Sequence, residues 1–213
     1  MEKILLIGGG GHCVGVIDSI ESQKTYEIVG IIDLPEKLGQ KIAGYEVIGT
    51  DNDLEEFFDN GIKKVFLTLG SIGNCFLRQK LAENCKKIGY EFATIIDPTA
   101  IIARNVVIKN GVYVGKGVII NNESIIEENA IINTGSIIEH NCNIGRFCHI
   151  APGVTLGGNV VVNDYSHIGL GSSVIQNITI GNNSLIGSHS NVINDIPDHV
   201  IAYGNPCKVV SEK

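Results

Sequence analysis

A period of six residues runs through the second half of the chain without interruption. From Ile102 to Val192, sixteen successive positions at this spacing carry isoleucine, leucine or valine. A second row, two residues earlier and running from Ala100 to Ser190, is almost entirely small or β-branched. A helix would drift out of phase with a period of six, whereas short strands joined by tight turns keep it. The pattern predicts a parallel β-helix in which three hexapeptides form one triangular coil.

Both rows are expected to face inward and fill the prism. Asparagine and glycine crowd the positions between strands, where left-handed backbone conformations are needed, as at Asn121–Asn122, Gly157–Gly158 and Asn182–Asn183. After Val192 the period stops. We therefore expect a β-helix domain over residues 98–194 and a tail over residues 195–213 that covers the open end of the coil.

The first 97 residues predict a small α/β module. A β-rich run at residues 3–8 leads into the turn Gly8–His12, an apolar-periodic helix to about Gln23 and a second strand at residues 27–33. Such a turn offers backbone N–H groups to an anion at a helix N-terminus. Helices near 51–60 and 74–88 and strands near 64–69 and 92–96 complete the module.

The glycine-rich turn does not meet the dinucleotide fingerprint, because Cys13 or Val14 stands where the third glycine is required. The module is also too short for a full dinucleotide-binding domain. A nucleotide-binding module therefore fits better than a dehydrogenase. The alternative is that the glycines serve only tight strand–helix packing. His12, Asp33 and Gly70 are expected at the carboxyl edge of the parallel sheet, where ligands bind in open α/β folds.

Composition excludes several classes of function. The net charge of −7, without a cluster of basic residues, argues against nucleic acid and anionic membranes as partners. No apolar run is long enough for a signal peptide or a transmembrane helix, so we expect a cytoplasmic protein. The six cysteines include no C-x-x-C pair, and Cys142 and Cys148 fall in the small inward row, where we expect buried hydrophobic side chains.

The histidine spacing carries information about assembly. His140 and His149 are nine residues apart, half of one coil, so they should lie on opposite sides of the prism. A site that uses both must join two chains, and a closed ring of three is the simplest such assembly. His167 follows His149 by one full coil and should stack on it. Taken singly, His167, His189 and His199 are expected to be solvated turn residues. A metal held by His149 and His167 would lack a third ligand, so no metal is expected.

Taken together, these motifs resemble those of the bacterial sugar O-acyltransferases and nucleotide-sugar N-acetyltransferases. The resemblance spans nearly the whole chain and includes Gly8–His12, the strand that ends at Asp33, the hexapeptides, the segment Asn133–His140 and the closing Gly204–Lys208. It implies an α/β nucleotide-sugar-binding module followed by a left-handed parallel β-helix. It also implies a homotrimer with active sites between subunits, acetyl-CoA as co-substrate, and a nucleotide sugar as acceptor.

The resemblance also implies a role for each site residue. His140 would be the general base, and an imidazole suits this role because its pKa lies near working pH. Asn133 would face the acceptor. Backbone N–H groups would stabilise the oxyanion, and no acyl-enzyme is implied. Acetyl-CoA contacts map to His149, Leu170 and Ser188, and sugar-nucleotide contacts map to Gly10, Gly11, His12, Asp33 and Gly70.

Asn141 departs from the family pattern, in which many members carry an acid directly after the histidine. An amide oxygen can orient the imidazole, but it adds no charge to stabilise the imidazolium. His140 is then a weaker base that acts on an easier acceptor, or Glu139 or a neighbouring chain supplies the charge. Since an amine needs less help than a hydroxyl, Asn141 favours an amino sugar. Transfer to a sugar hydroxyl, as on sialic acid or a polysaccharide precursor, is the alternative. A non-catalytic β-helix binding module is the third reading.

Overall fold

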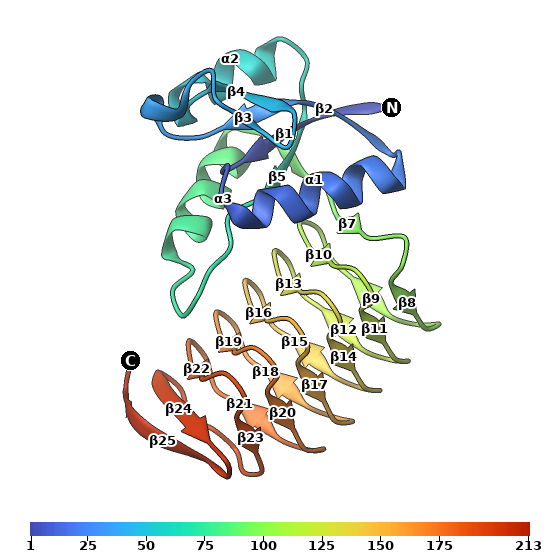
Figure 1. Ribbon diagram of the computed structural model, residues 1–213, viewed down its shortest axis with the longest axis vertical. Coiled ribbons are helices and arrows are strands. Elements are labelled where there is room, and N and C mark those ends of the chain that lie inside the picture. Colours follow the sequence, from blue (N-terminus) through green and yellow to red (C-terminus); the bar gives the residue numbers. More distant parts are fainter. The chain divides into compact units, whose positions relative to one another are not determined.

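The computed structural model describes residues 1–213 and divides into two compact units (Figure 1). The first unit consists of Met1–Gly70 and Phe76–Ile95, and the second consists of Ser71–Cys75 and Ile96–Lys213. The segment Ser71–Cys75 thus leaves the first unit and packs with the second. The hexapeptide pattern contains no sign of this excursion.

The first unit is built on a six-stranded sheet with the order β3-β4-β2-β1-β5-β6. Its central strand β1 is parallel to β2 and β5. Residues Ile4, Leu5, Leu6 and Ile7 of β1 are almost fully buried, as in parallel strands covered on both faces. The elements are β1 (Glu2–Ile7), α1 (Gly11–Gln23), β2 (Tyr26–Ile32), η1 (Pro35–Lys37), β3 (Lys41–Ile42), β4 (Tyr45–Gly49), η2 (Asp51–Asp53), α2 (Leu54–Asp59), β5 (Lys64–Leu67), α3 (Phe76–Ile88) and β6 (Glu91–Phe92).

The hairpin of β3 and β4 is absent from the sequence-based expectation. Its turn has positive φ at Ala43 and Gly44, 47° and 93° respectively. Alanine rarely adopts this conformation, and tight hairpins usually carry Asn-Gly or Asp-Gly at these positions. The sequence Ala43–Gly44 therefore did not indicate a hairpin. The expected helix at 51–60 is a short 3₁₀ turn, η2, followed by α2.

The second unit is the β-helix, with three parallel faces (Figure 1). Each strand pairs with the strand one coil later, as Ile119 does with Ile137 and His149 with His167. Face 1 contains β7 (Ile95–Ile96), β10 (Tyr113–Val114), β13 (Ile131–Ile132), β16 (His149–Ile150), β19 (His167–Ile168) and β22 (Leu185–Ile186). Face 2 contains β8 (Ile101–Ile102), β11 (Ile119–Ile120), β14 (Ile137–Ile138), β17 (Thr155–Leu156), β20 (Ser173–Val174) and β23 (Asn191–Val192). Face 3 contains β9 (Val107–Ile108), β12 (Ile125–Ile126), β15 (Asn143–Ile144), β18 (Val161–Val162) and β21 (Thr179–Ile180).

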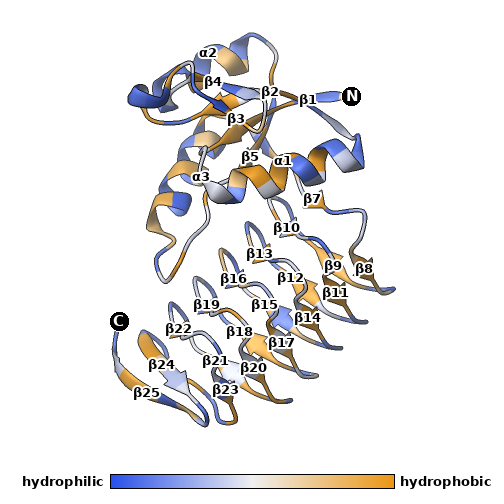
Figure 2. Ribbon diagram, in the orientation of Figure 1, coloured by the Kyte–Doolittle hydropathy of each residue, from blue (hydrophilic) through white to orange (hydrophobic).

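The inward rows form one continuous apolar core. Members such as Ile138, Ile144, Ile150 and Leu156 have no exposed surface. Figure 2 shows that most of the short strands are hydrophobic and that the turns between them are more hydrophilic. From Val112 onward the two rows predicted from the sequence are buried, whereas their first members, up to Ile108, are only partly buried.

The serines of the small row also tie successive coils together. The Ser166 hydroxyl donates to the Gly181 carbonyl over 2.6 Å and accepts from the Ser184 N–H over 2.9 Å. Ser172 makes the same pair of bonds with Gly187 and Ser190. These hydroxyls satisfy turn groups that the prism would otherwise bury unpaired. Side-chain size alone, the basis of the sequence-based expectation, does not account for this second role.

Replacing Ser166 by alanine is expected to lower the free energy of unfolding by about 1–3 kcal/mol, because two buried backbone groups lose their partner. Denaturant unfolding measures this loss. Ser173→Ala on the exposed side of β20 is the matched control and should change stability by less than about 0.5 kcal/mol. Equal losses in the two variants would show that the inward hydroxyl has no special role.

The tail closes the last coil by extending face 1. Strand β24 (Val200–Gly204) is parallel to β22, and β25 (Cys207–Glu212) returns antiparallel to β24. Val200, Ala202 and Cys207 join the apolar core. The tail therefore acts as a cap made of strands.

Candidate active site

His140 lies in an exposed turn on the edge between face 2 and face 3, after β14 and before β15. Its Nδ1 lies 2.9 Å from Oδ1 of Asn141. Because an amide oxygen only accepts hydrogen bonds, Nδ1 is the donor of this bond, and in the neutral ring Nε2 keeps its lone pair. In its neutral form the imidazole thus presents Nε2 as a basic nitrogen at this turn.

Asn141 occupies a left-handed position in the turn, with φ of 60°. The residues one coil before and after it, Glu123 and Asn159, have φ of 61° and 59°. Their side chains pair along the prism, Glu123 with Asn105 over 2.7 Å and Asn159 with Asn177 over 3.1 Å. Asn141 instead turns to the imidazole. Glu123 shows that this backbone position also accepts an acidic side chain.

The backbone around His140 is fixed from inside the prism. The Ser124 hydroxyl donates to the Glu139 carbonyl over 2.9 Å and accepts from the Cys142 N–H over 3.1 Å. All six cysteines are buried and unbridged. Burial raises the pKa of the Cys142 thiol to about 11, so it is a poor source of thiolate near neutral pH. The expectation of buried, structural cysteines at positions 142 and 148 is confirmed.

A second polar cluster lies on face 1, around the buried His149. Nδ1 of His149 lies 2.7 Å from the Ser71 carbonyl oxygen, and Nε2 lies 3.2 Å from Nδ2 of Asn133. The Asn133 Oδ1 accepts the Thr134 N–H over 2.9 Å, which directs the amide nitrogen toward His149. Both ring nitrogens of His149 therefore have partners in its own chain.

His167 pairs with His149 one coil later, as the eighteen-residue spacing predicted, and the two rings meet edge to face. The ring centroids are 4.8 Å apart, with an angle of 82° between the planes. The prediction of a solvated turn residue at His167 is wrong, because this side chain lies in β19 and is only 7% exposed. Burial, with His149 beside it, lowers the pKa of His167 to about 4, so the ring is neutral near pH 7. His189 and His199 are exposed turn residues, as predicted.

The segment Ser71–Cys75 lies against the outward side chains of face 1. Its Ser71 carbonyl bonds His149, and a side chain at Gly73 would contact Leu185 at 3.5 Å. The outward row of this face includes both histidines and Leu185. The repeat pattern could not reveal this covering, because the segment lies outside the hexapeptides.

The candidate residues fall into two groups on the prism. Asn133 and His149 lie together, and Leu170 and Ser188 are exposed in later turns on the edge between face 1 and face 2. His140 and Asn141 lie on the edge between face 2 and face 3. Asn133 therefore belongs with His149 and not with His140 of the same chain.

The first unit contains a cavity of about 500 Å³ at the carboxyl edge of its sheet. Gly10, Asp33 and Gly70 line it, and Gly11 and His12 begin α1 beside Gly10. Gly10 caps α1 without a side-chain hydrogen bond. Sequence reasoning did not identify the rest of its wall, which includes Leu34, Lys37, Thr50, Asp51, Asn52 and Leu77. Several of these follow β4, the strand that was not predicted.

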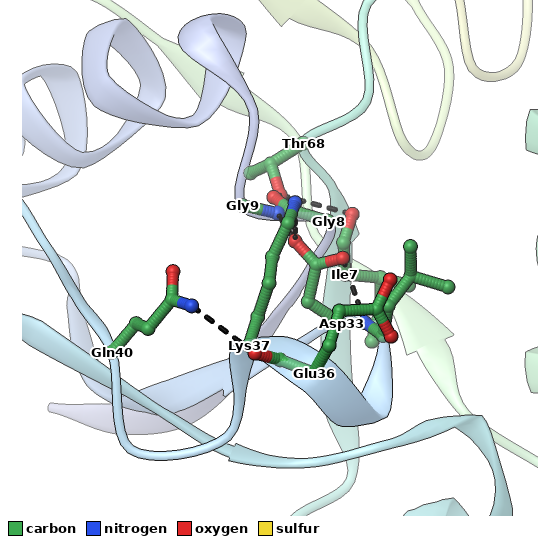
Figure 3. A network of polar contacts seen from close by, with 9 residues as sticks. Ile7, Gly8, Gly9, Asp33, Glu36, Lys37, Gln40 and Thr68 are labelled. Carbon is green, nitrogen blue, oxygen red and sulfur yellow. Dashed lines mark hydrogen bonds and ion pairs between the residues drawn. The ribbon is translucent and has the colours of Figure 1, made fainter.

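Asp33 organises the glycine-rich turn (Figure 3). Its carboxylate accepts the Gly9 N–H over 2.6 Å and the Leu34 N–H over 2.7 Å, and pairs with the Lys37 ammonium over 2.9 Å. Burial opposes ionisation, but these three donors outweigh it and hold the pKa of Asp33 below its ordinary value. Lys37 supplies a cation next to the turn. The i,i+4 spacing from Asp33 was the signal in the sequence that could have identified Lys37.

Comparison with known proteins identifies the family. Residues 3–85 match the PglD N-terminal domain, and residues 80–170 match the GMPPB C-terminal domain. A variant of GDP-perosamine N-acetyltransferase from Caulobacter crescentus, solved with CoA and GDP-perosamine, is 33% identical over 100% of this chain and 98% of its own, with a TM-score of 0.93. The chain belongs to the hexapeptide-repeat nucleotide-sugar acyltransferases. The β-helix of this family is left-handed.

Another acyltransferase gives the same alignment of whole chains. The acetyltransferase domain of PglB from Neisseria gonorrhoeae, solved with acetyl coenzyme A, is 28% identical over 98% of this chain and 99% of its own, with a TM-score of 0.89. No curated protein matches the chain. As in the sequence-based expectation, the resemblance to these acyltransferases covers both units.

No group of three or more His, Cys, Asp or Glu side chains has the arrangement of a metal site. None of the helices combines the length and the apolar character needed to cross a bilayer.

Proposed function

We propose that this protein transfers the acetyl group of acetyl-CoA to the amine of a nucleotide-linked amino sugar, with His140 as general base. The observation that carries the proposal is the His140 imidazole, exposed at a turn, with Nδ1 bonded to Asn141 and Nε2 available. The solved relatives support the substrates, since GDP-perosamine N-acetyltransferase was crystallised with CoA and GDP-perosamine. The same relative was also solved with a single histidine replaced by alanine or by asparagine.

In the proposed reaction the amine nitrogen attacks the thioester carbonyl carbon directly. Nε2 of His140 takes the amine proton as the C–N bond forms, and backbone N–H groups stabilise the oxyanion. The tetrahedral intermediate then breaks its C–S bond. The CoA sulfur leaves with its electron pair and receives the proton from the imidazolium. No cysteine takes part, which agrees with the burial of all six.

Asn141 suits this acceptor. It fixes the tautomer of His140 but adds no negative charge that would stabilise the imidazolium. A neutral amine is already nucleophilic and needs a base chiefly to remove its proton after attack has begun. A sugar hydroxyl would need a stronger base.

We further propose that the active site joins two chains of a cytoplasmic homotrimer. His140 and Asn141 come from one chain. His149, Leu170 and Ser188 of the next chain form the acetyl-CoA side, and Asn133 lies beside His149, where it would face the acceptor. Both ring nitrogens of His149 already have hydrogen-bond partners in the same chain. His149 therefore acts on the site indirectly, by holding the Asn133 amide and the Ser71 carbonyl in place.

A thiol-release assay tests the reaction. Purified protein is incubated with acetyl-CoA and a panel of nucleotide amino sugars that includes GDP-perosamine, and the products are weighed by mass spectrometry. An acetyl group that survives mild base is an amide, as proposed, and one that is lost is an ester on a hydroxyl. Failure to release CoA with every member of the panel contradicts the proposal.

The cavity of the first unit is proposed to bind the nucleotide. Glycine-turn N–H groups at the start of α1 and the Lys37 ammonium suit its phosphates. Asp33→Asn is expected to raise the KM for the nucleotide sugar about tenfold, because the turn and Lys37 lose a charged acceptor. The KM for acetyl-CoA should not change. Asp18→Asn on the exposed side of α1 is the control, and an equal effect there would contradict the assignment.

A further inference from the structure

Gly158 lies one coil after His140, at the same position of the same turn. The column of equivalent positions reads Arg104, Asn122, His140, Gly158 and Gln176. Every other member carries a polar side chain. The φ of Gly158 is outside the left-handed region, so the backbone there would accept any L-residue. Backbone conformation therefore does not explain this glycine.

The imidazole of His140 explains it. A Cβ at Gly158 would lie 2.6 Å from both Cε1 and Nε2 of His140 and 3.3 Å from Cδ2. These are the three nearest atoms, and 2.6 Å is much shorter than a non-bonded contact of a real Cβ. At the adjacent Gly157, by contrast, a Cβ would meet the backbone nitrogen of Gln176. The space above Gly158 is thus filled by the ring of His140.

We infer that Gly158 is a positioning residue for His140. The imidazole packs against the backbone of Gly158, which has no side chain, and the Asn141 amide accepts a hydrogen bond from Nδ1. The two contacts fix the place of Nε2. This inference rests on the proposed role of His140 as the base.

Gly158→Ala is expected to change the catalytic rate without changing stability. The His140 ring is exposed and at the end of a flexible side chain, so it can swing away from a new methyl group at little cost in stability. Nε2 is then no longer held in the position that it has in the wild type. Because a misplacement of about 1 Å can lower a rate about 100-fold, we expect kcat to fall about 100-fold while the melting temperature changes little.

The experiment combines a kinetic cycle with spectroscopy. The kcat of Gly158→Ala is compared in the wild-type and His140→Ala backgrounds, and the imidazole of His140 is followed by ¹H–¹⁵N NMR. Gln176→Ala, the next member of the column, is the control and should keep wild-type kcat. We expect about a 100-fold loss that disappears in the His140→Ala background, together with altered ring signals of His140.

Each other outcome overturns the inference. Activity of Gly158→Ala within threefold of wild type, an equal loss in the His140→Ala background, or unchanged ring signals of His140 would show that Gly158 acts elsewhere or not at all. If Gly158→Ala alone fails to fold, His140→Ala/Gly158→Ala must fold like His140→Ala, since the ring is absent. If the wild type releases no CoA with any amino sugar, the proposed function fails. The NMR comparison then still decides whether Gly158 places the ring.

Discussion

His140→Ala is expected to lower kcat for acetyl transfer by about 10²–10⁴-fold, the usual contribution of a general base. The loss should fall on kcat and leave the KM for acetyl-CoA nearly unchanged, because the imidazole acts on the reacting amine. Its exposed turn should make the free energy of unfolding insensitive to the change, within about 0.5 kcal/mol. Steady-state kinetics on the amino sugar identified by the thiol-release assay measures the effect.

The matched control for this variant is His199→Ala. His199 is also an exposed histidine in a left-handed turn, with φ of 56°, but it lies near the cap of the prism. It should retain wild-type kcat. Full activity in His140→Ala would show that His140 is not the general base. An equal loss of kcat in both variants would indicate a general effect of changing a turn.

Asn141→Gly is expected to lower kcat by about 10–100-fold, the usual cost of losing a residue that orients a functional histidine. Glycine accepts the φ of 60° without strain, so the variant removes the amide and leaves the turn intact. The imidazole then samples both tautomers and several orientations. A kcat within threefold of wild type would show that Gly158 and the substrates suffice to hold the ring.

Asn141→Asp tests the charge at the same position. A carboxylate beside Nδ1 stabilises the protonated form of the imidazole. Because the base must be unprotonated, the acidic limb of the pH–rate profile should move upward by about one pH unit. Transfer to hydroxyl acceptors should improve relative to amines. An unchanged acidic limb would mean that the residue at position 141 does not face the ring during catalysis.

The β-helix could be predicted in detail because its signal is redundant. Inward residues such as Ile138 and Ile150 repeat one physical demand at every coil, so a local irregularity cannot hide the pattern. The pairing of His149 with His167 followed from the same arithmetic. The separation of His140 from His149 did as well, since half a coil places two residues on different sides of a prism.

The features that escaped prediction depend on contacts without a period. His167 is buried beside His149, whose Nδ1 contacts the Ser71 carbonyl of a segment distant in the chain. The wall of the cavity near Thr50 depends on β4, whose hairpin turn at Ala43 has no usual sequence signal. The pairing of Asn133 with His149 depends on side-chain directions at an edge of the prism, which spacing alone does not give.

Mixed trimers test most directly whether the active site joins His140 of one chain to the acetyl-CoA side of the next. Chains carrying His140→Ala are assembled with chains carrying Leu170→Glu, each with its own affinity tag, and the mixed species are purified through both tags. Each variant alone should be inactive. In a ring of three that contains both, one interface combines two intact halves, so about one third of wild-type activity is expected. Mixed species that remain inactive, or a protein that is monomeric in solution, would contradict a site shared between chains.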